Sequence, residues 1–322
     1  METYETVISS AAFLADLNSL NTAIADALRA AGEPVAINGN VCYPHLKEDF
    51  HLGDLSPLME AKRRALVVLA QRSTCFVEVG VAGGHALLIA LHANPDIKCI
   101  GIDLAQRLRA SWPPVEVFVP ATFEWFRSHY PHRTLMLQEE AISGLSKVVT
   151  DQPFGPVNLL HLDGDKRNRF AELRTIWPGL AEDAYLMQGD TRNGHVVADT
   201  NAMMAQGLAK PVDDKEIQAI AAKNFQCLEI GKNVYAQSLT LDDLIGKRVL
   251  LCVAHQDDET LFAGGLLDAL KGRATVTIAS FFALPKGAKT HIPVVLLWRM
   301  LATTLVPHAS STPLLLKSTT GV

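Results

Sequence analysis

The sequence lacks the marks of several protein classes. None of its five cysteines forms a CxxC pair, and most lie in apolar, strand-like runs, which indicates buried, reduced thiols in a cytoplasmic protein. The longest apolar stretch, Ile292 to Val306, is shorter than a bilayer span and has Arg299 at its centre, so no membrane helix is expected. The first ten residues, METYETVISS, are acidic and polar, unlike a secretory signal.

Basic patches are also absent. Lys and Arg number 29 against 34 Asp and Glu, and no basic cluster with interleaved aromatic residues occurs, so nucleic-acid binding is not expected. What the chain does have is a hydrophobic content of 48% over 322 residues, sufficient for one large domain or two ordinary ones. We therefore expect a globular protein with a small-molecule partner; homo-oligomerisation is left open.

The spacing of apolar residues predicts the domain organisation. Helical periodicity over residues 11–31 indicates a helical cap spanning 1–55, and strand-like runs alternate with helical segments from 56 to 239. Such alternation is typical of βαβ units with helices on both faces of a parallel sheet. The stretch NFQCLEIGKNVYAQSL (224–239) predicts a closing antiparallel hairpin. We expect a Rossmann-like, doubly wound α/β sheet with this C-terminal hairpin, a linker at 240–247 and a partial second α/β unit at 248–322.

A glycine-rich turn follows the first strand of the predicted sheet. It reads Glu78-x-Gly80-x-x-x-Gly84, and Asp103 ends the next strand. The dinucleotide fingerprint G-x-G-x-x-G does not fit, because Ala82 and His85 stand where glycines are needed. The pattern instead resembles the class I S-adenosylmethionine-dependent methyltransferases from about residue 56 to 239. The alternative is that the glycines only provide a tight strand-to-helix connection.

The resemblance implies S-adenosylmethionine as the cofactor. An acid near its sulfonium and amino groups is favourable, a role that falls to Glu78, and Asp103 would accept both ribose hydroxyls. The adenine contact after the third strand would come from Glu139 or Glu140 in the stretch LQEEA. The implied cofactor-binding residues are thus Glu78, Gly80, Gly84, Asp103, Glu139 and Glu140.

Acids also follow the fourth and fifth strands, in HLDGDKRNR and QGDTRNG. Asp163, Asp165 and Asp190 should converge, because ligands bind outside the carboxyl ends of parallel strands. This resembles sugar and small-molecule O-methyltransferases, some of which hold a divalent metal, and implies catalytic roles for Asp163 and Asp190 and a Mg²⁺ site between them. Thr191 departs from the catechol-type pattern, and solvated acids at helix N-termini are the alternative.

Two histidines near these acids are candidate general bases. His195 lies on the loop after the fifth strand, where a substrate could reach it. His161 lies within the fourth strand and is expected to point into the packing.

A second motif, AHQDDE, follows an apolar strand near the C-terminus. It resembles the HPDDE signature of the PIG-L-type zinc N-deacetylases. The resemblance implies His255 and Asp258 as Zn²⁺ ligands and Asp257 as the base that deprotonates the metal-bound water. A catalytic zinc needs a third ligand, and the chain after Phe282 does not resemble that family, which suggests a truncated or frameshifted gene. His291 and His308 are the remaining candidates for the third ligand.

The leading hypothesis is a methyltransferase that acts on a hydroxyl or amine of a small, sugar-containing metabolite. One alternative is a zinc-dependent N-acetyl-sugar deacetylase with the first unit as its scaffold. Another is a degenerate fusion that binds the cofactor without catalysis. The sequence does not identify the methyl acceptor.

Overall fold

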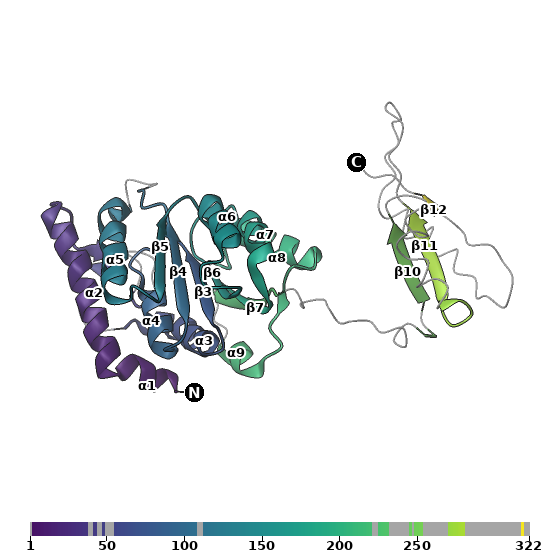
Figure 1. Cartoon of the computed structure of the whole chain (residues 1–322), viewed down its shortest axis with the longest axis horizontal. Coiled ribbons are helices and arrows are strands. Elements are labelled where there is room, and N and C mark those ends of the chain that lie inside the picture. Colours follow the sequence, from purple (N-terminus) through teal and green to yellow (C-terminus); the bar gives the residue numbers. More distant parts are fainter. Residues whose placement is uncertain are drawn as a thin grey trace, which may run out of the picture. The chain divides into compact units, whose positions relative to one another are not determined.

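The computed structural model divides the chain into two units, Met1–Tyr235 and Ala236–Val322 (Figure 1). No described helix is long and apolar enough to cross a membrane. The residues that the structure describes are 2–37, 41–43, 47–48, 55–107, 112–220, 225–231, 245–246, 248–253, 270–280 and 317–318.

A seven-stranded sheet forms the centre of the first unit, with strand order β5-β4-β3-β6-β7-β9-β8. The first five strands in this order are parallel, as the alternating sequence pattern predicts. The Rossmann-like α/β class is thereby confirmed. The strands are β3 (Cys75–Val79), β4 (Lys98–Asp103), β5 (Thr134–Gln138), β6 (Val157–Leu162), β7 (Leu180–Gly189), β8 (Lys210–Pro211) and β9 (Phe225–Glu229).

The antiparallel element at the end of the sheet is present, and its strand β9 lies in the first half of the predicted hairpin. Strand β9 is antiparallel to β7 on one side and to β8 on the other. On the side of β9 away from β7, the described partner is thus the short upstream strand Lys210–Pro211. Residues 232–239, which the sequence suggested for this role, lie outside the described residues. An all-parallel dinucleotide-binding sheet has no such inserted strand.

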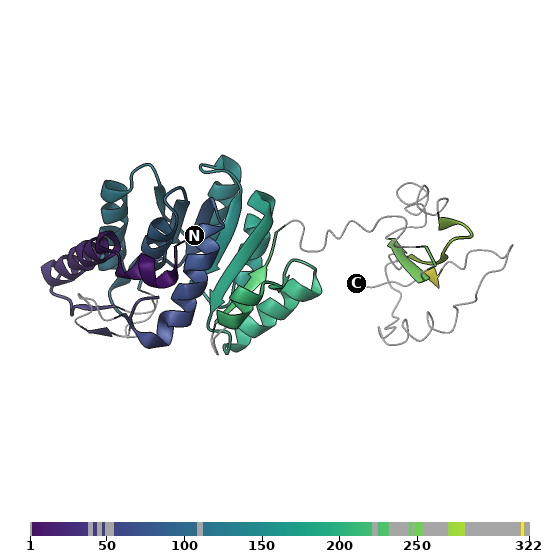
Figure 2. The same cartoon turned by 90° about the horizontal axis from the view of Figure 1, so that it is seen from below.

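Helices cover both faces of the sheet (Figure 2). Successive residues of β3 alternate between two separate cores: Phe76 packs in one core and Val77 in the other. The first core is built with α3 (Glu60–Gln71), α4 (His85–Ala93), α5 (Val115–His129) and α9 (Lys215–Ile220), and the second with α6 (Ala141–Asp151), α7 (Arg169–Ile176) and α8 (Gly194–Ala205). The short elements are β1 (Ala36–Ile37), β2 (Lys47–Glu48), η1 (Pro57–Met59) and η2 (Trp177–Gly179).

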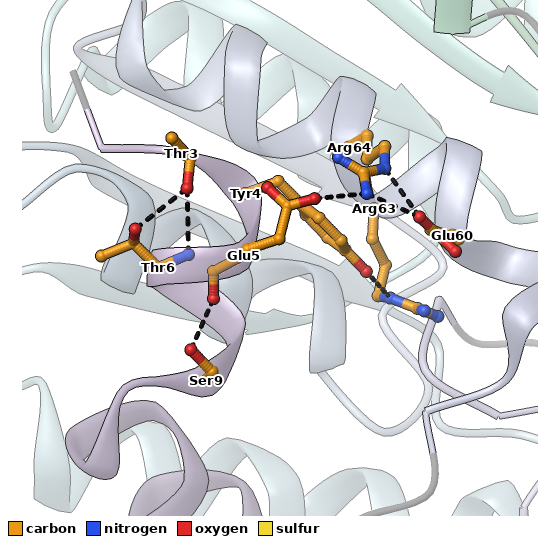
Figure 3. A network of polar contacts seen from close by, with 8 residues as sticks. All are labelled: Thr3, Tyr4, Glu5, Thr6, Ser9, Glu60, Arg63 and Arg64. Atoms are coloured by element: carbon orange, nitrogen blue, oxygen red, sulfur yellow. Dashed lines mark hydrogen bonds and ion pairs between the residues drawn. The ribbon is translucent and has the colours of Figure 1, made fainter.

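The predicted N-terminal cap consists of α1 (Tyr4–Ser9) and α2 (Ala11–Ala30), which pack against the first core. Arg63 of α3 is buried and joins three segments: it donates to Tyr4 Oη at 2.9 Å, to the Val41 carbonyl at 3.0 Å and to the Ser56 carbonyl at 2.9 Å. Figure 3 shows the neighbouring Arg64 bridging Glu5 of α1 and Glu60. The cap is therefore tied to α3 by buried and surface contacts, and both belong to the first unit.

In the second unit, β10 (Arg248–Val253) runs parallel to β11 (Thr275–Ser280), and β12 (Lys317–Ser318) pairs parallel with β11. A parallel pair at β10 and β11 agrees with the predicted start of a second βαβ unit. The AHQDDE turn between them is not described. The predicted zinc-site residues His255, Asp257 and Asp258, and the alternative ligands His291 and His308, all lie outside the described residues.

Candidate functional site

The bend after β3 brings two strand ends into backbone contact. Gly80 has φ +85°, and a Cβ there would lie 2.6 Å from the Gly164 nitrogen and 2.8 Å from the Asp163 carbonyl carbon. Two further hydrogen bonds hold the junction: Gly80 N donates to Ile102 O, and Asp163 N donates to Val79 O, both at 2.9 Å. Only glycine combines this left-handed conformation with so close an approach.

Gly84 caps the N-terminus of α4 with φ +73°. A Cβ on this residue would overlap the side chains of α5, at 2.8 Å from Thr122 Cγ2 and closer still to the Phe126 ring. Gly84 is thus required for the close packing of the bend against α5. Glycine is thus needed at the two positions for different reasons: Gly80 lets the ends of β3 and β6 meet, and Gly84 lets the start of α4 pack against α5.

Asp103 lies where the sequence predicts it, at the end of β4 beside the bend. Its Oδ2 accepts a hydrogen bond from Ala82 N at 3.0 Å, and its Oδ1 accepts one from Ala105 N at 2.8 Å. These bonds fix the carboxylate against the glycine turn. The residue is only partly buried, and each oxygen keeps a lone pair for a ligand.

The two candidate adenine contacts differ. Glu139 follows β5 directly, and its N donates to Asp103 O at 3.1 Å, so it lies beside the end of β4. Its carboxylate bonds Lys147 and, at 2.8 Å, Ser143 Oγ; the hydrogen bond from Lys147 lowers the pKa of Glu139. Glu140 instead caps α6, accepting from Ser143 N at 3.1 Å. Glu139 therefore lies beside Asp103, whereas the Glu140 carboxylate caps α6.

Glu78 is buried on β3, next to a histidine of the neighbouring strand. Glu78 and His161 are register partners, and Glu78 Oε1 lies 2.8 Å from His161 Nδ1. The other carboxyl oxygen has no hydrogen-bond partner among the described residues. Burial, with the charge of Asp163, raises the pKa of Glu78 well above its ordinary value, and burial lowers the pKa of His161 to about 3. His161 points inward, as the sequence suggested.

Asp163, just past the end of β6, pairs with a lysine that sequence reasoning missed. Lys62 Nζ of α3 lies 3.0 Å from Asp163 Oδ2, with side chains 11% and 16% exposed. Burial acts to raise the pKa of Asp163, but Lys62, through its charge and its hydrogen bond, together with His161 and Arg169, outweighs burial and holds that pKa below its ordinary value. A Cβ at Gly189 would meet both groups, at 3.4 Å from Asp163 Oδ1 and 3.5 Å from Lys62 Nζ. The glycine that ends β7 leaves room for this pair.

The residues after β7 are more exposed. Asp190 has φ +58° and pairs with Lys166 Nζ at 2.8 Å. His195 is the second residue of α8, two positions after the N-cap Asn193, and it is exposed. In the part of the chain that the structure describes, no hydrogen bond or ion pair joins His195 to Asp163 or Asp190.

The arrangement does not support the predicted magnesium site. No group of three His, Cys, Asp or Glu side chains suited to a metal occurs among the described residues. Asp163 and Asp190 are each neutralised by a lysine instead. Their carboxylates therefore act as ion-pair partners in this structure.

His85, the first residue of α4, connects the bend to the N-terminal cap. Its Nε2 lies 2.8 Å from Asn21 Oδ1, and its ring packs edge-on against Tyr43 at 5.3 Å between centroids. Burial lowers the pKa of His85 to about 3, so the ring is neutral. The N-terminal cap therefore contacts the first residue of α4, directly after the glycine turn.

Several solved structures are similar to part of this chain. A cofactor-bound structure of Rv0187 from MTB has a TM-score of 0.40 and 15% identity over 66% of this chain and 90% of that one. The chain is structurally similar to class I S-adenosylmethionine-dependent methyltransferases. An O-methyltransferase from Bacillus cereus in complex with SAH has a TM-score of 0.40 and 14% identity over 71% of this chain and 96% of that one. The O-methyltransferase TomG from Streptomyces achromogenes, in complex with SAM, has a TM-score of 0.39 and 14% identity over 66% of this chain and 89% of that one.

Likenesses at these values carry no conclusion about the cofactor, acceptor or metal of this chain. No family model and no curated protein matches the sequence. The deacetylase resemblance near the C-terminus has no support from these comparisons.

Proposed function

We propose that the chain is an S-adenosylmethionine-dependent methyltransferase acting on a hydroxyl or amine of a small molecule. The observation that carries the proposal is the bend after β3, where Gly80 leaves no room for a side chain between the ends of β3 and β6. Asp103 accepts a hydrogen bond from Ala82 N in this bend, and the ionised Asp163 lies next to Gly80. A backbone turn flanked by carboxylates suits a ligand that carries both ribose hydroxyls and positive charge. A sugar-containing acceptor rests on the sequence resemblance.

The residues present fit the chemistry that this cofactor needs. When bound, the sulfonium supplies an electrophilic methyl carbon. Gly80 permits close approach of the backbone, the first turn of α4 presents N–H groups at its positive end, and Asp103 accepts from hydroxyls. Holding two reactants in line is worth several kcal/mol, on the order of 7–11 at best.

The acceptor is expected beyond the carboxyl ends of β6 and β7, where Asp190 and His195 lie. An exposed imidazole such as that of His195 is the side chain best suited to take up the acceptor proton near neutral pH. Asp190 is the second candidate for orienting a hydroxyl or amine, because its carboxylate is partly exposed.

Calorimetric titration with S-adenosylmethionine tests the cofactor assignment. We expect the wild-type chain to bind, and Asp103→Ala to weaken the affinity at least tenfold, about 1.4 kcal/mol, because the ribose hydroxyls lose their acceptor. Asp151→Ala, which removes an exposed carboxylate at the end of α6, should leave the affinity unchanged. Equal affinity in Asp103→Ala and wild type would remove Asp103 from this role, and no binding by wild type would refute the proposed function.

A further inference from the structure

Three polar side chains meet where the N-terminal cap packs on α4 and α5. Asp16 belongs to α2, His92 to the last turn of α4, and Tyr130 is the C-cap residue of α5. His92 Nε2 lies 3.0 Å from Asp16 Oδ2 and 3.1 Å from Tyr130 Oη. Tyr130 Oη also donates to the same oxygen of Asp16. One atom from each side chain thus forms the corner of a small triangle.

Hydrogen bonding alone does not satisfy this triangle. All three of its edges have hydrogen-bond length, but a phenol oxygen and one imidazole nitrogen carry at most two protons between them. Both protons are needed for the two edges that end on Asp16 Oδ2, which is an acceptor only. The edge between His92 Nε2 and Tyr130 Oη therefore has no proton of its own.

The same three atoms are arranged as the ligands of a metal ion would be. Atoms bonded to one tetrahedral zinc ion at ~2.0–2.2 Å lie roughly 3.3 Å apart, close to the 3.0 and 3.1 Å of the triangle. An imidazole nitrogen with two oxygens is a donor set that suits first-row transition metals. Only two of the side chains are of the His, Cys, Asp or Glu type, so the triangle is consistent with the absence of any trio of that type among the described residues.

The surroundings favour the forms of the side chains that bind metals. Burial lowers the pKa of His92, which keeps its imidazole neutral and able to act as a ligand. Burial and the hydrogen bond to Asp16 raise the pKa of Tyr130, whereas the charge of Arg133 acts to lower it. The Arg133 guanidinium carbon lies 5.7 Å from the centre of the Tyr130 ring. A bound cation would act in the same direction as Arg133 and favour the phenolate.

We propose that Asp16 Oδ2, His92 Nε2 and Tyr130 Oη form a binding site for a divalent transition-metal ion. The ion takes the place of the Tyr130 phenol proton, which is released to solvent, and water completes the coordination. The Asp16 side chain is 31% exposed and that of His92 is 13% exposed, so the ion has access from solvent. The site lies at the opposite end of α4 from Gly84, and it does not depend on the cofactor assigned to the glycine bend.

Zinc titration of the full chain, freed of metal with a chelator, tests the site. We expect wild type to bind Zn²⁺ with a dissociation constant of about 1 μM or tighter, to release a proton and to show the ultraviolet difference band of tyrosinate. Tyr130→Phe keeps the ring and removes only the oxygen, so it should lose this band. Tyr130→Phe, Asp16→Asn and His92→Gln should each weaken zinc binding at this site by about tenfold or more. The band separates this site from any zinc taken up by the AHQDDE motif.

His129→Gln is the matched control, because His129 is an exposed histidine adjacent to Tyr130 in the chain. It should leave the zinc affinity and the tyrosinate band unchanged, and an equal loss in His129→Gln would assign the zinc to the surface and overturn the proposal. Wild type that binds no zinc, or that binds it without the tyrosinate band, also overturns the proposal. So does a Tyr130→Phe variant that binds as tightly as wild type. Because Tyr130→Phe is near-isosteric, its result decides the matter if Asp16→Asn or His92→Gln does not fold.

Discussion

Gly80→Ala is expected to lower the free energy of unfolding by about 2–5 kcal/mol and to abolish measurable S-adenosylmethionine binding. A non-glycine residue in the left-handed region costs roughly 1–2 kcal/mol, and overpacking adds roughly 1–3 kcal/mol. The atoms that the new Cβ would meet at 2.6 and 2.8 Å are all backbone atoms of Asp163 and Gly164, which cannot rotate away. The end of β6 must therefore move, and with it the Asp163 carboxylate.

Gly155→Ala provides the matched control for this prediction. Gly155 has φ +80°, close to that of Gly80, but nothing lies within 4 Å of a Cβ built on it. The free energy of unfolding of Gly155→Ala should fall only by the cost of the left-handed conformation, about 1–2 kcal/mol. Urea unfolding of the two variants and wild type gives both values. Equal losses in the two variants would mean that the strand ends at Gly80 are not in contact.

The parts of the fold that the sequence predicts are those with a local signal. Strand and helix periods alternate clearly, so the parallel sheet and the positions of strand ends follow from the pattern. Gly80, Gly84 and Asp103 are found together because each terminates or begins an element, and the carboxyl ends of parallel strands share one edge of the sheet.

What the sequence could not give depends on pairing between distant segments. One of the two partners of β9 is the two-residue strand Lys210–Pro211, which is too short to show any period. The Glu78–His161 contact depends on the register between β3 and β6, and Lys62 reaches Asp163 only because α3 packs over that face. The same lysine pairs with one of the strand-end acids that the sequence pattern assigned to a metal site. A cation on a separate helix has no signal in the spacing of the acids.

The buried acid Glu172 leads to the second large effect. Glu172 on α7 is fully buried, and neither of its carboxyl oxygens has a hydrogen-bond partner among the described residues. Arg169, one turn earlier, is also fully buried, but its Nη1 donates a hydrogen bond to the Gly189 carbonyl at 2.9 Å. Burial raises the pKa of Glu172 to about 7, although the charge of Arg169 opposes the rise.

Glu172→Gln is therefore expected to stabilise the protein increasingly as the pH rises. With an ordinary pKa of 4.5 and a folded-state pKa of about 7, the folded chain binds the extra proton between these values. The stability that Glu172 contributes through this proton is fully present below pH 4.5 and is lost as the pH rises through 7. Since a pKa difference of one corresponds to about 1.4 kcal/mol, the variant should gain about 3 kcal/mol over wild type between pH 4.5 and pH 8.5.

Urea unfolding of wild type and Glu172→Gln at both pH values measures this gain. Glu124→Gln is the control, because the Glu124 side chain is 76% exposed and its removal should give no pH-dependent difference. A difference between Glu172→Gln and wild type that stays constant with pH would show that Glu172 is ionised at a water-like pKa, and hence that solvent reaches the space between α7 and the end of β7.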